Sequence, residues 1–413
     1  MDVIHDRVAG LDVSKADVKV CVRTPGRRRG QRHTEVRTFD TTTAGLLAAR
    51  EWLEQQQVTK IAMEATGDYW RSPFYLLEGL CDLDLVNAAQ VKAMPGRKTD
   101  VTDAMWLAQL TECGLTRSSF VPPEPIRQLR DLTRYRSALV AAQTREKNRL
   151  EKELEDAGIK LSLVATDIFG VSGRLMLDAL IAGERDPQAL AELAKGRLRP
   201  KRDALQRAML GRFNQHHAFL CRMHLDRIDQ ITRDVDELSR RISEVMAPFH
   251  PTITLLTTVP GINTQLAEVI TAEIGADMTV FPTPAQLCSW AGVAPGNHQS
   301  GPRRKRAKTT PGDSWLRAAL GVAAMSATRT NNTYLAATYR RYLRRMPKLK
   351  ALVALQHSML HAIWHMITNN KPYQDLGADH HHTRRDPTRV VQQALRTLNA
   401  CGYTATLHPI AAA

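Results

Sequence analysis

The segment 121–125, VPPEP, is the feature that most constrains the fold of this chain. Its three prolines lack a backbone N–H and fix φ, so neither a helix nor a central strand can continue through them. Strand-like and helix-like stretches alternate before this segment, whereas long stretches of helical period follow it. We therefore expect a domain boundary here, with an α/β domain before it and mainly α-helical parts after it.

The first 120 residues contain apolar runs with the length and period of strands near 7–13, 17–23, 34–39, 60–65 and 83–88. Amphipathic helices are expected over 44–56 and 69–80. This order of elements, two or three consecutive strands followed by βαβα units, resembles the mixed sheet of an RNase H-like domain. The basic residues of the turn between the second and third strands are expected to be solvated or to contact phosphate: Arg27, Arg28, Arg29 and Arg32.

Carboxylates stand at the ends of two predicted strands and at the start of a predicted helix. Asp12 and Glu64 end apolar runs, while Asp100 and Asp103 lie three apart, on one face of a first helical turn. Paired Mg²⁺ ions need several hard oxygen ligands from separate elements, so this pattern indicates a two-metal phosphodiester site. Taken singly, an acid in such a place is more often a solvated residue, a strand-end turn residue or a helix cap than a metal ligand.

Composition points to a nucleic-acid partner. The 413 residues suffice for two or three domains, and 57 Lys and Arg against 42 Asp and Glu give a net charge of +15. The six cysteines show no CxxC spacing, which argues against a zinc module or a disulfide framework and fits a reducing cytoplasm. The chain has neither an export signal nor an apolar run of about 18 residues, so we expect no membrane association.

Two stretches in the middle of the chain, 126–159 and 219–245, have a partly heptad-like apolar pattern. They can pair as an antiparallel coiled coil within the chain or form a seam between two chains, and the pattern fits both. The residues between them, 163–218, are expected to form a small helical insertion.

Residues 255–275 predict two helices joined by a tight turn at Pro260 and Gly261. Such a helix-hairpin-helix turn presents backbone N–H groups to phosphate, although a purely structural hairpin fits equally well. Asp313 is expected to cap the helix that follows. The stretch from about 371 is less patterned, and the consecutive histidines His380, His381 and His382 are a weak metal signal.

Ser300 is followed by a run of cations, which are Arg303, Arg304, Lys305, Arg306 and Lys308. A serine attacks phosphate only where its alkoxide and the transition-state charge are stabilised, and these cations can supply that stabilisation. The alternative is a loop serine beside a nucleic-acid-binding run. A further cationic helix is expected to track the phosphate backbone with Arg340, Arg341, Arg344, Arg345, Lys348 and Lys350.

Five motifs together resemble transposases of the insertion-sequence one-ten type, including its eleven-eleven branch. They are GLDVSK, AMEATGDYW, KTDVTDA, TTVPGI and AGVAPGNHQSG. In order and spacing they cover most of the chain apart from its helical middle and its tail.

This resemblance implies four parts: a RuvC-like DEDD domain over 1–120, a coiled-coil linker over 121–250, a serine transposase domain over 251–370 and a tail over 371–413. It implies that Asp12, Glu64, Asp100 and Asp103 hold Mg²⁺, as two ions, and that Ser300 attacks DNA to form a covalent phosphoserine. One departure is Pro302, where the family commonly has a second glycine. His298, close to the serine, is expected to contact phosphate.

The resemblance also implies the partners. These are double-stranded DNA at the element ends and target, a structured bridge RNA that selects both sites, and further copies of the chain, as a dimer that pairs to a tetramer on DNA. The expected location is the bacterial cytoplasm, at the nucleoid. Two rival readings remain: a RuvC-like endonuclease that uses only the carboxylates, and a non-catalytic nucleic-acid-binding scaffold.

Overall fold

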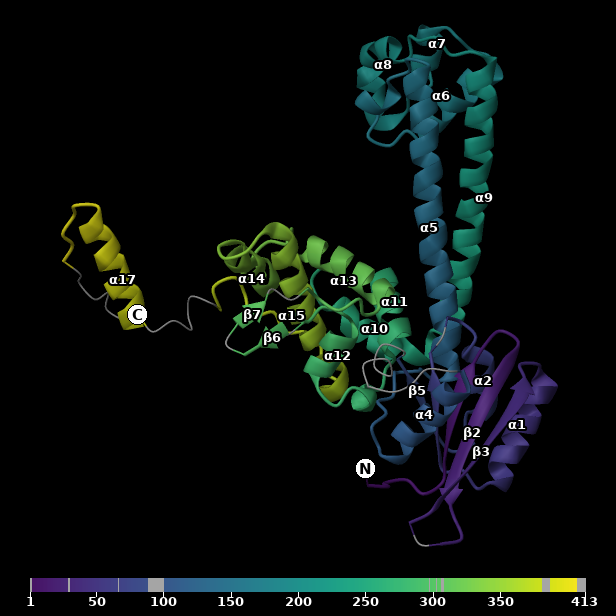
Figure 1. The fold of residues 1–413 in the computed structure, drawn as a ribbon. Helices are drawn as coiled ribbons and strands as arrows, with labels where there is room; N and C mark the ends of the chain where they lie inside the picture. The colour runs from purple at the N-terminus through teal and green to yellow at the C-terminus, as the bar shows by residue number, and fades with distance from the viewer. Residues whose placement is uncertain are drawn as a thin grey trace. The chain divides into compact units, whose positions relative to one another are not determined.

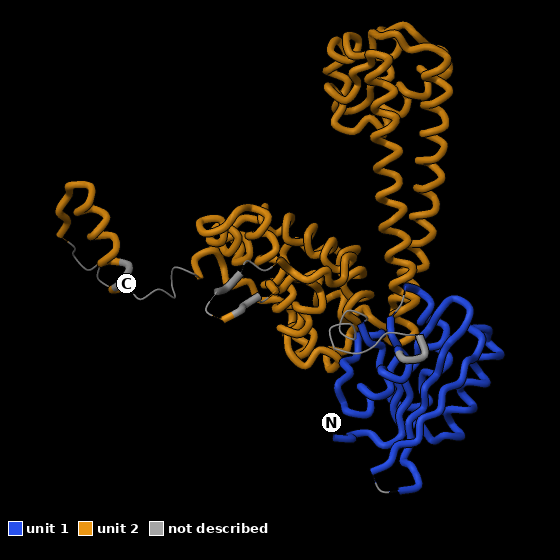
Figure 2. Tube along the Cα trace, in the orientation of Figure 1, with its two compact units in different colours: residues 1–121 blue, residues 122–413 orange. Residues whose placement is uncertain are grey.

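The computed structural model describes residues 2–28, 30–65, 67–87, 100–296, 298–301, 303–305, 308–380 and 387–406. For 100–102, 298–300, 303–305, 387, 389 and 390 it describes the backbone alone. The chain forms two compact units, Met1–Val121 and Pro122–Ala413, shown in Figure 2. The division falls within the proline-rich segment.

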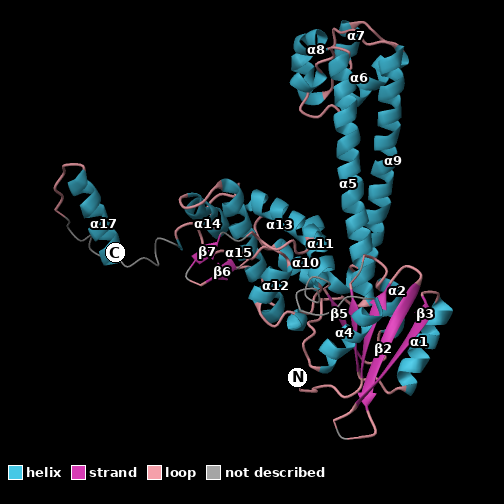
Figure 3. Ribbon diagram, in the orientation of Figure 1, coloured by secondary structure: helices cyan, strands magenta, loops and turns pink. Residues whose placement is uncertain are grey.

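The first unit contains the predicted mixed sheet, and the prediction of a mixed α/β domain is confirmed (Figures 1 and 3). Its strands are β1 Val8–Val13, β2 Asp17–Pro25, β3 Arg32–Asp40, β4 Lys60–Glu64 and β5 Asp82–Val86. They lie in the order β3-β2-β1-β4-β5. The first three pair antiparallel, whereas β1, β4 and β5 are parallel.

Helices cover both faces of this sheet. Side chains alternate along each strand, and the side chains on both faces are apolar enough to pack against helices. Its helices are α1 Thr43–Gln55, α2 Arg71–Leu77 and α4 Asp100–Glu112. On one face Leu11 and Ile61 join a core that contains Trp52 and Leu53 of α1. On the other face Cys21 packs with Ala104 and Ala108 of α4, so the two helical layers bury opposite sides of the sheet.

Arg32 was expected in a solvated turn, and this expectation is wrong. It is the first residue of β3, its side chain is 16% exposed, and its guanidinium pairs with Glu112 at the end of α4. Arg23 binds the same carboxylate at 2.9 Å. The nearly buried Glu112 attracts both cations because an unpaired buried charge is costly.

The second unit begins with two long helices that pair antiparallel within the chain (Figure 1). They are α5 Glu124–Asp156 and α9 Gln215–Val245. Gln143 hydrogen-bonds Thr232 at 2.8 Å, and further along α5 Glu146 contacts His224 at 2.9 Å. The contact residue in α9 therefore has a lower number as the contact residue in α5 has a higher one, which is the order of antiparallel helices. Of the two arrangements left open by the sequence, this structure has the pairing within the chain.

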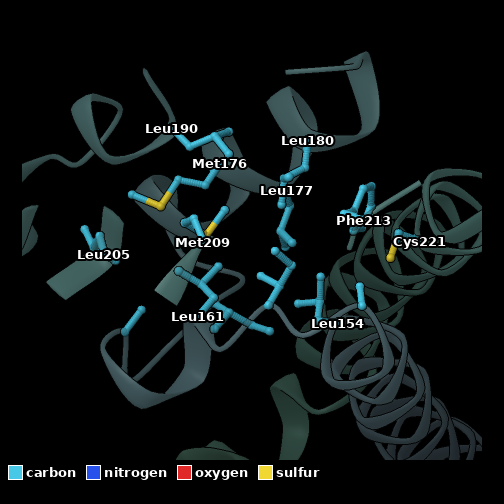
Figure 4. Packing of buried hydrophobic residues seen from close by; sticks show 14 of the residues in the cluster. Leu154, Leu161, Met176, Leu177, Leu180, Leu190, Leu205, Met209, Phe213 and Cys221 are labelled. Atoms are coloured by element: carbon cyan, nitrogen blue, oxygen red, sulfur yellow. The ribbon is translucent and has the colours of Figure 1, made fainter. Parts of the chain in front are cut away.

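The predicted helical insertion between them is confirmed. It consists of η1 Leu161–Leu163, α6 Val171–Ala182, α7 Pro187–Glu192, η2 Gly196–Lys201 and α8 Arg202–Ala208. Figure 4 shows its core, in which Leu161, Met176, Leu177 and Met209 pack beside Leu154 of α5. The insertion therefore has an apolar core continuous with the end of the long helices.

Where the structure describes it, the rest of the second unit is mainly helical and includes a short hairpin. Its elements are η3 Ala247–Phe249, α10 His250–Thr257, α11 Thr264–Ile274, η4 Met278–Val280, α12 Pro284–Trp290, β6 His298–Ser300, β7 Arg303–Lys305, α13 Ser314–Ala327, α14 Tyr334–Leu343, α15 Lys348–Asn369 and α17 Pro387–Ala400. No helix in the described ranges is long and apolar enough to cross a membrane.

The turn between α10 and α11 packs against α13. Gly261 has φ +93°, and a Cβ there would lie less than 3.0 Å from the carbonyl oxygen of Ala323 and the amide nitrogen of Ala327. Only glycine fits such a close backbone approach. This packing favours the structural hairpin among the two readings of the turn.

Two expectations for the carboxy-terminal region are corrected. The prediction of a single cationic helix is wrong, because α14 ends at Leu343 and Pro347 is the N-cap of a second helix, α15. A proline disfavours helical backbone at the residue before it, so Pro347 separates the two helices. The tail, expected to be less patterned, contains α17.

Candidate active site

Asp12 and Glu64 each follow the last residue of their strand that is paired between the neighbouring strands β1 and β4, at one edge of the sheet. β1 and β4 are parallel, with Leu11 opposite Met63, so the next residue along each strand is a carboxylate. Two residues earlier on these strands, Gly10 and Ala62 face α4. Because side chains alternate, Asp12 and Glu64 belong to the same face.

Helix α4 directs its first turn toward the same edge. A Cβ on Gly10 would lie less than 3.0 Å from the backbone of Ala104 and Ala108, so the helix crosses β1 at Gly10. At its other end Glu112 pairs with Arg23, the register partner of Val8. The helix therefore runs antiparallel to β1. Its amino-terminal turn points toward the strand end that carries Asp12.

That first turn contains Asp100 and Asp103. Asp103 has a half-buried side chain, and Asp100 is the first residue of α4, with its side chain outside the described set. The acids thus come from two strand ends and a helix start. Among the side chains that the structure describes, no three His, Cys, Asp or Glu residues are grouped closely enough to hold a metal ion. The donor set, all carboxylate oxygens from separate elements, nevertheless has the chemistry that Mg²⁺ prefers.

An aromatic group follows Glu64, and sequence reasoning did not single it out. The ring of Trp70 meets those of Phe74 and Tyr75 edge to face, with centroids 5.7 and 6.1 Å apart. Tyr69 is 48% exposed and Tyr75 is 39% exposed. Exposed aromatic faces of this kind can stack against nucleotide bases. The signal in the sequence was the DYW triplet shortly after the acid.

Ser300 is the last residue of β6 in a two-stranded hairpin, so the alternative reading of a loop serine does not describe its backbone. β6 and β7 pair antiparallel, with Ser300 opposite Arg303 and His298 opposite Lys305. Gly301, with φ +59°, forms part of the turn between them. Arg306 and Pro302 lie outside the described residues. The hairpin register aligns the serine with the first cation of the basic run.

The base of this hairpin is closed by contacts between its two arms, shortly before α13 begins. Pro295 and Thr309 form an antiparallel bridge, and the amide of Gly296 donates to the carbonyl of Lys308 at 3.2 Å. The predicted cap is confirmed, because the Asp313 carboxylate accepts from the amide of Leu316 at 2.7 Å. The chain returning from the hairpin is thus held directly at the start of α13.

A buried ion-pair network joins α5, α11 and the start of α13. Both oxygens of the fully buried Glu273 accept from the Arg134 guanidinium at 2.7 Å, and Arg134 also contacts Asp313 at 3.2 Å. Burial raises the pKa of Glu273, while Arg134 opposes this shift. Burial alone would lower the pKa of Arg134, but its hydrogen bonds to Glu273 hold that pKa above its ordinary value. Sequence reasoning missed this network because Arg134 and Glu273 are far apart in the chain.

The remaining predicted nucleic-acid contacts are exposed where their side chains are described. Arg340 and Arg341 lie in the last turn of α14, and Arg344 and Arg345 follow it. Lys308 is also exposed. For Arg303, Arg304 and Lys305 only the backbone, in β7, is described. These exposed cations are accessible for phosphate contacts.

Comparison with known proteins places this chain in the class of DNA transposases. The transposase family model DEDD_Tnp_IS110 matches residues 9–159, and a second model, described as Transposase IS116/IS110/IS902 family, matches residues 253–340. Both parts therefore match models of one family in order along the chain. The chain belongs to the IS110 family of transposases.

Individual relatives match over shorter lengths. The "Insertion element IS110 uncharacterized 43.6 kDa protein" of Streptomyces coelicolor (strain ATCC BAA-471 / A3(2) / M145) is 44% identical over 52 residues, 13% of each chain. Thermus thermophilus RuvC is 12% identical with a TM-score of 0.22, over 27% of this chain and 99% of that one. The T. thermophilus RuvC complex with a Holliday junction substrate is 12% identical with a TM-score of 0.21, over 28% and 100%.

Proposed function

We propose that this transposase cleaves and exchanges DNA strands through a covalent phosphoserine at Ser300, with a carboxylate site formed by Asp12, Glu64, Asp100 and Asp103. The observation that carries the proposal is the convergence of two strand-end acids and the first turn of α4 on one edge of the sheet. Four acids at one edge repel one another unless cations accompany them.

The carboxylates are assigned to hold Mg²⁺, as two ions. When bound, the ions neutralise phosphate charge and polarise the scissile phosphodiester. The protein's own contribution is to hold the ligands still. Asp12 and Glu64 are fixed by the β1–β4 ladder, and the close contact of α4 with Gly10 fixes the helix that carries Asp100 and Asp103.

In the proposed strand cleavage, the Ser300 hydroxyl oxygen forms a bond to phosphorus as the bond from phosphorus to one sugar oxygen breaks. The serine proton leaves to a base or water, and the departing sugar oxygen gains a proton. Strand joining reverses these changes with a sugar hydroxyl from another strand, and Ser300 regains its proton. The phosphoserine bond conserves the energy of the phosphodiester, so joining needs no external energy source. His298 and Arg303 are assigned to contact the phosphate.

The partners follow the same proposal. A bridge RNA would select double-stranded target and donor sites, and the protein would contact backbone and shape. The exposed Arg340, Arg341, Arg344 and Arg345 support phosphate contacts. We assign residues 1–120 to the metal-binding domain, 121–250 to the linker, 251–370 to the serine domain and 371–413 to the tail, in chains that form a dimer and then a tetramer on DNA.

Covalent trapping tests this function directly. The full chain is incubated with Mg²⁺, labelled element-end DNA and RNA transcribed from the flanks of its gene, then denatured and examined for labelled protein. We expect an adduct that is lost in Ser300→Ala and retained in Ser289→Ala, an exposed serine of the same region. Asp12→Asn and Glu64→Gln should abolish both cleavage and the adduct.

Other outcomes identify the rival readings. DNA cleavage without an adduct, unchanged in Ser300→Ala, would leave a nuclease that uses only the carboxylates. Nucleic-acid binding that is unchanged in every variant, with no cleavage by the parent protein, would leave a scaffold.

A further inference from the structure

The exposed face of α15 carries three histidines in a single row. His357, His361 and His365 are four residues apart, so they lie one above another along the helix. The ring centroids of His357 and His361 are 6.4 Å apart, and those of His361 and His365 are 4.9 Å apart. His361 and His365 are exposed, and His357 is half-buried. The proposed strand transfer uses none of them.

The closer pair has the separation that one bound ion requires. An imidazole nitrogen about 2.0 Å from an ion puts the ring centroid about 3.2 Å from it, so two rings at a tetrahedral angle have centroids about 5.2 Å apart. A right angle gives about 4.5 Å by the same geometry. The 4.9 Å between the ring centroids of His361 and His365 lies between these two values, whereas the 6.4 Å between those of His357 and His361 lies outside them.

The surroundings of the pair favour metal binding. Trp364 meets the His365 ring edge to face at 4.9 Å, and its indole Nε1 donates to the carbonyl of Phe281 at 2.8 Å. The anchored indole restricts His365 and reduces the entropy lost when an ion binds. Burial lowers the pKa of His361, and the neighbouring charges of His365 and His357 add to this effect. Neutral imidazole is the form that binds metals.

We propose that His361 and His365 form an open two-ligand site for a divalent transition metal such as Ni²⁺, Cu²⁺ or Zn²⁺. Imidazole nitrogen selects these ions over Mg²⁺, which prefers oxygen. Two protein ligands leave the other coordination positions to water or to donors of a bound macromolecule. The site is independent of the carboxylates and of the proposed transposition chemistry.

Nickel titration calorimetry on the full chain tests this site. Excess MgCl₂ is present to occupy the carboxylates, and His380, His381 and His382 are replaced by Asn in every protein because the tail histidines offer a competing site. We expect one nickel site per chain, with affinity reduced at least tenfold in His361→Asn and in His365→Asn. His250→Asn, a replacement of a single exposed histidine at the start of α10, should leave the affinity unchanged.

Copper EPR gives a second measurement. We expect Cu²⁺ bound to the parent protein to show hyperfine coupling to two imidazole nitrogens, and Cu²⁺ bound to His365→Asn to show coupling to one. Circular dichroism and melting without metal establish that the variants are folded. No nickel site in the parent, or unchanged affinity in both His361→Asn and His365→Asn, would overturn the proposal. Loss of DNA binding in His361→Asn without any nickel site would also overturn it, and would make the row a phosphate contact.

Discussion

Replacing Glu273 by Ala removes the only carboxylate that binds Arg134 through both of its oxygens among the described contacts. The Glu273 side chain is 0% exposed and that of Arg134 is 27% exposed. Removing one partner of a buried ion pair costs about 3–5 kcal/mol, because the other charge stays uncompensated. Water reaches Arg134 in part and Asp313 remains beside it, so we expect the lower end, about 3 kcal/mol.

Hydrogen exchange followed by mass spectrometry measures this cost locally. A loss of about 3 kcal/mol raises the opening equilibrium of α11 and α13 roughly 100-fold, since each 1.4 kcal/mol is about tenfold. The helices of the insertion, α6 to α8, should exchange as before and serve as an internal reference. Glu273→Gln, which keeps the side-chain shape and one acceptor oxygen, should give a smaller increase.

Glu244→Ala is the matched control. Glu244 pairs with Arg241 at 3.0 Å, but both side chains are more than 60% exposed, at 66% and 62%. Exposed pairs contribute about 0–1 kcal/mol, so exchange near α9 should change less than about fivefold. If Glu273→Ala changes α11 exchange by no more than Glu244→Ala changes exchange near its own site, the reasoning about the buried network is refuted.

Three further predictions concern stability and thiol reactivity. Gly10→Ala should destabilise the first unit by about 3 kcal/mol or more, because the new Cβ meets the α4 backbone; a melting temperature equal to that of the parent would contradict this. The same change at Gly321, whose Cβ would meet only the Gln356 side chain at 3.5 Å, should stabilise α13 by about 0.5–1 kcal/mol in the same melting assay. Burial raises the pKa of Cys221 to about 12, so little of this cysteine is thiolate at pH 8. The exposed Cys401 should therefore be alkylated before Cys221. Equal labelling of the two cysteines, measured by peptide mass spectrometry, would contradict the burial of Cys221.

Local pattern in the sequence carried the prediction of the sheet. Strands β1 and β4 were expected over 7–13 and 60–65 and run over Val8–Val13 and Lys60–Glu64. Their apolar character reflects burial on both faces of a sheet covered by helices. The sequence placed Asp12 and Glu64 at strand ends for the same reason. That Asp12 and Glu64 are neighbours depends on the parallel register of β1 and β4, which the sequence pattern does not specify.

Some errors had local causes and others did not. Pro347 was a visible signal against one continuous cationic helix, and the spacing of the arginines was weighed above it. The burial of Arg32 had no local signal, because its partner Glu112 comes from a helix far along the chain. A basic residue beside a turn is normally solvated, and only a buried carboxylate reverses that preference.

The sequence by itself determined where the chain changes from an α/β to a helical pattern, which acids end strands, and which helical faces are apolar. Only the tertiary structure decided what covers those faces. The same heptad-like pattern satisfies a hairpin within one chain and a seam between two, and the structure selects the hairpin of α5 and α9. It also brings α4 onto Gly10 and the Trp364 indole of α15 to the carbonyl of Phe281. Periodicity records that a face is buried, whereas the identity of its partner depends on contacts between residues distant in sequence.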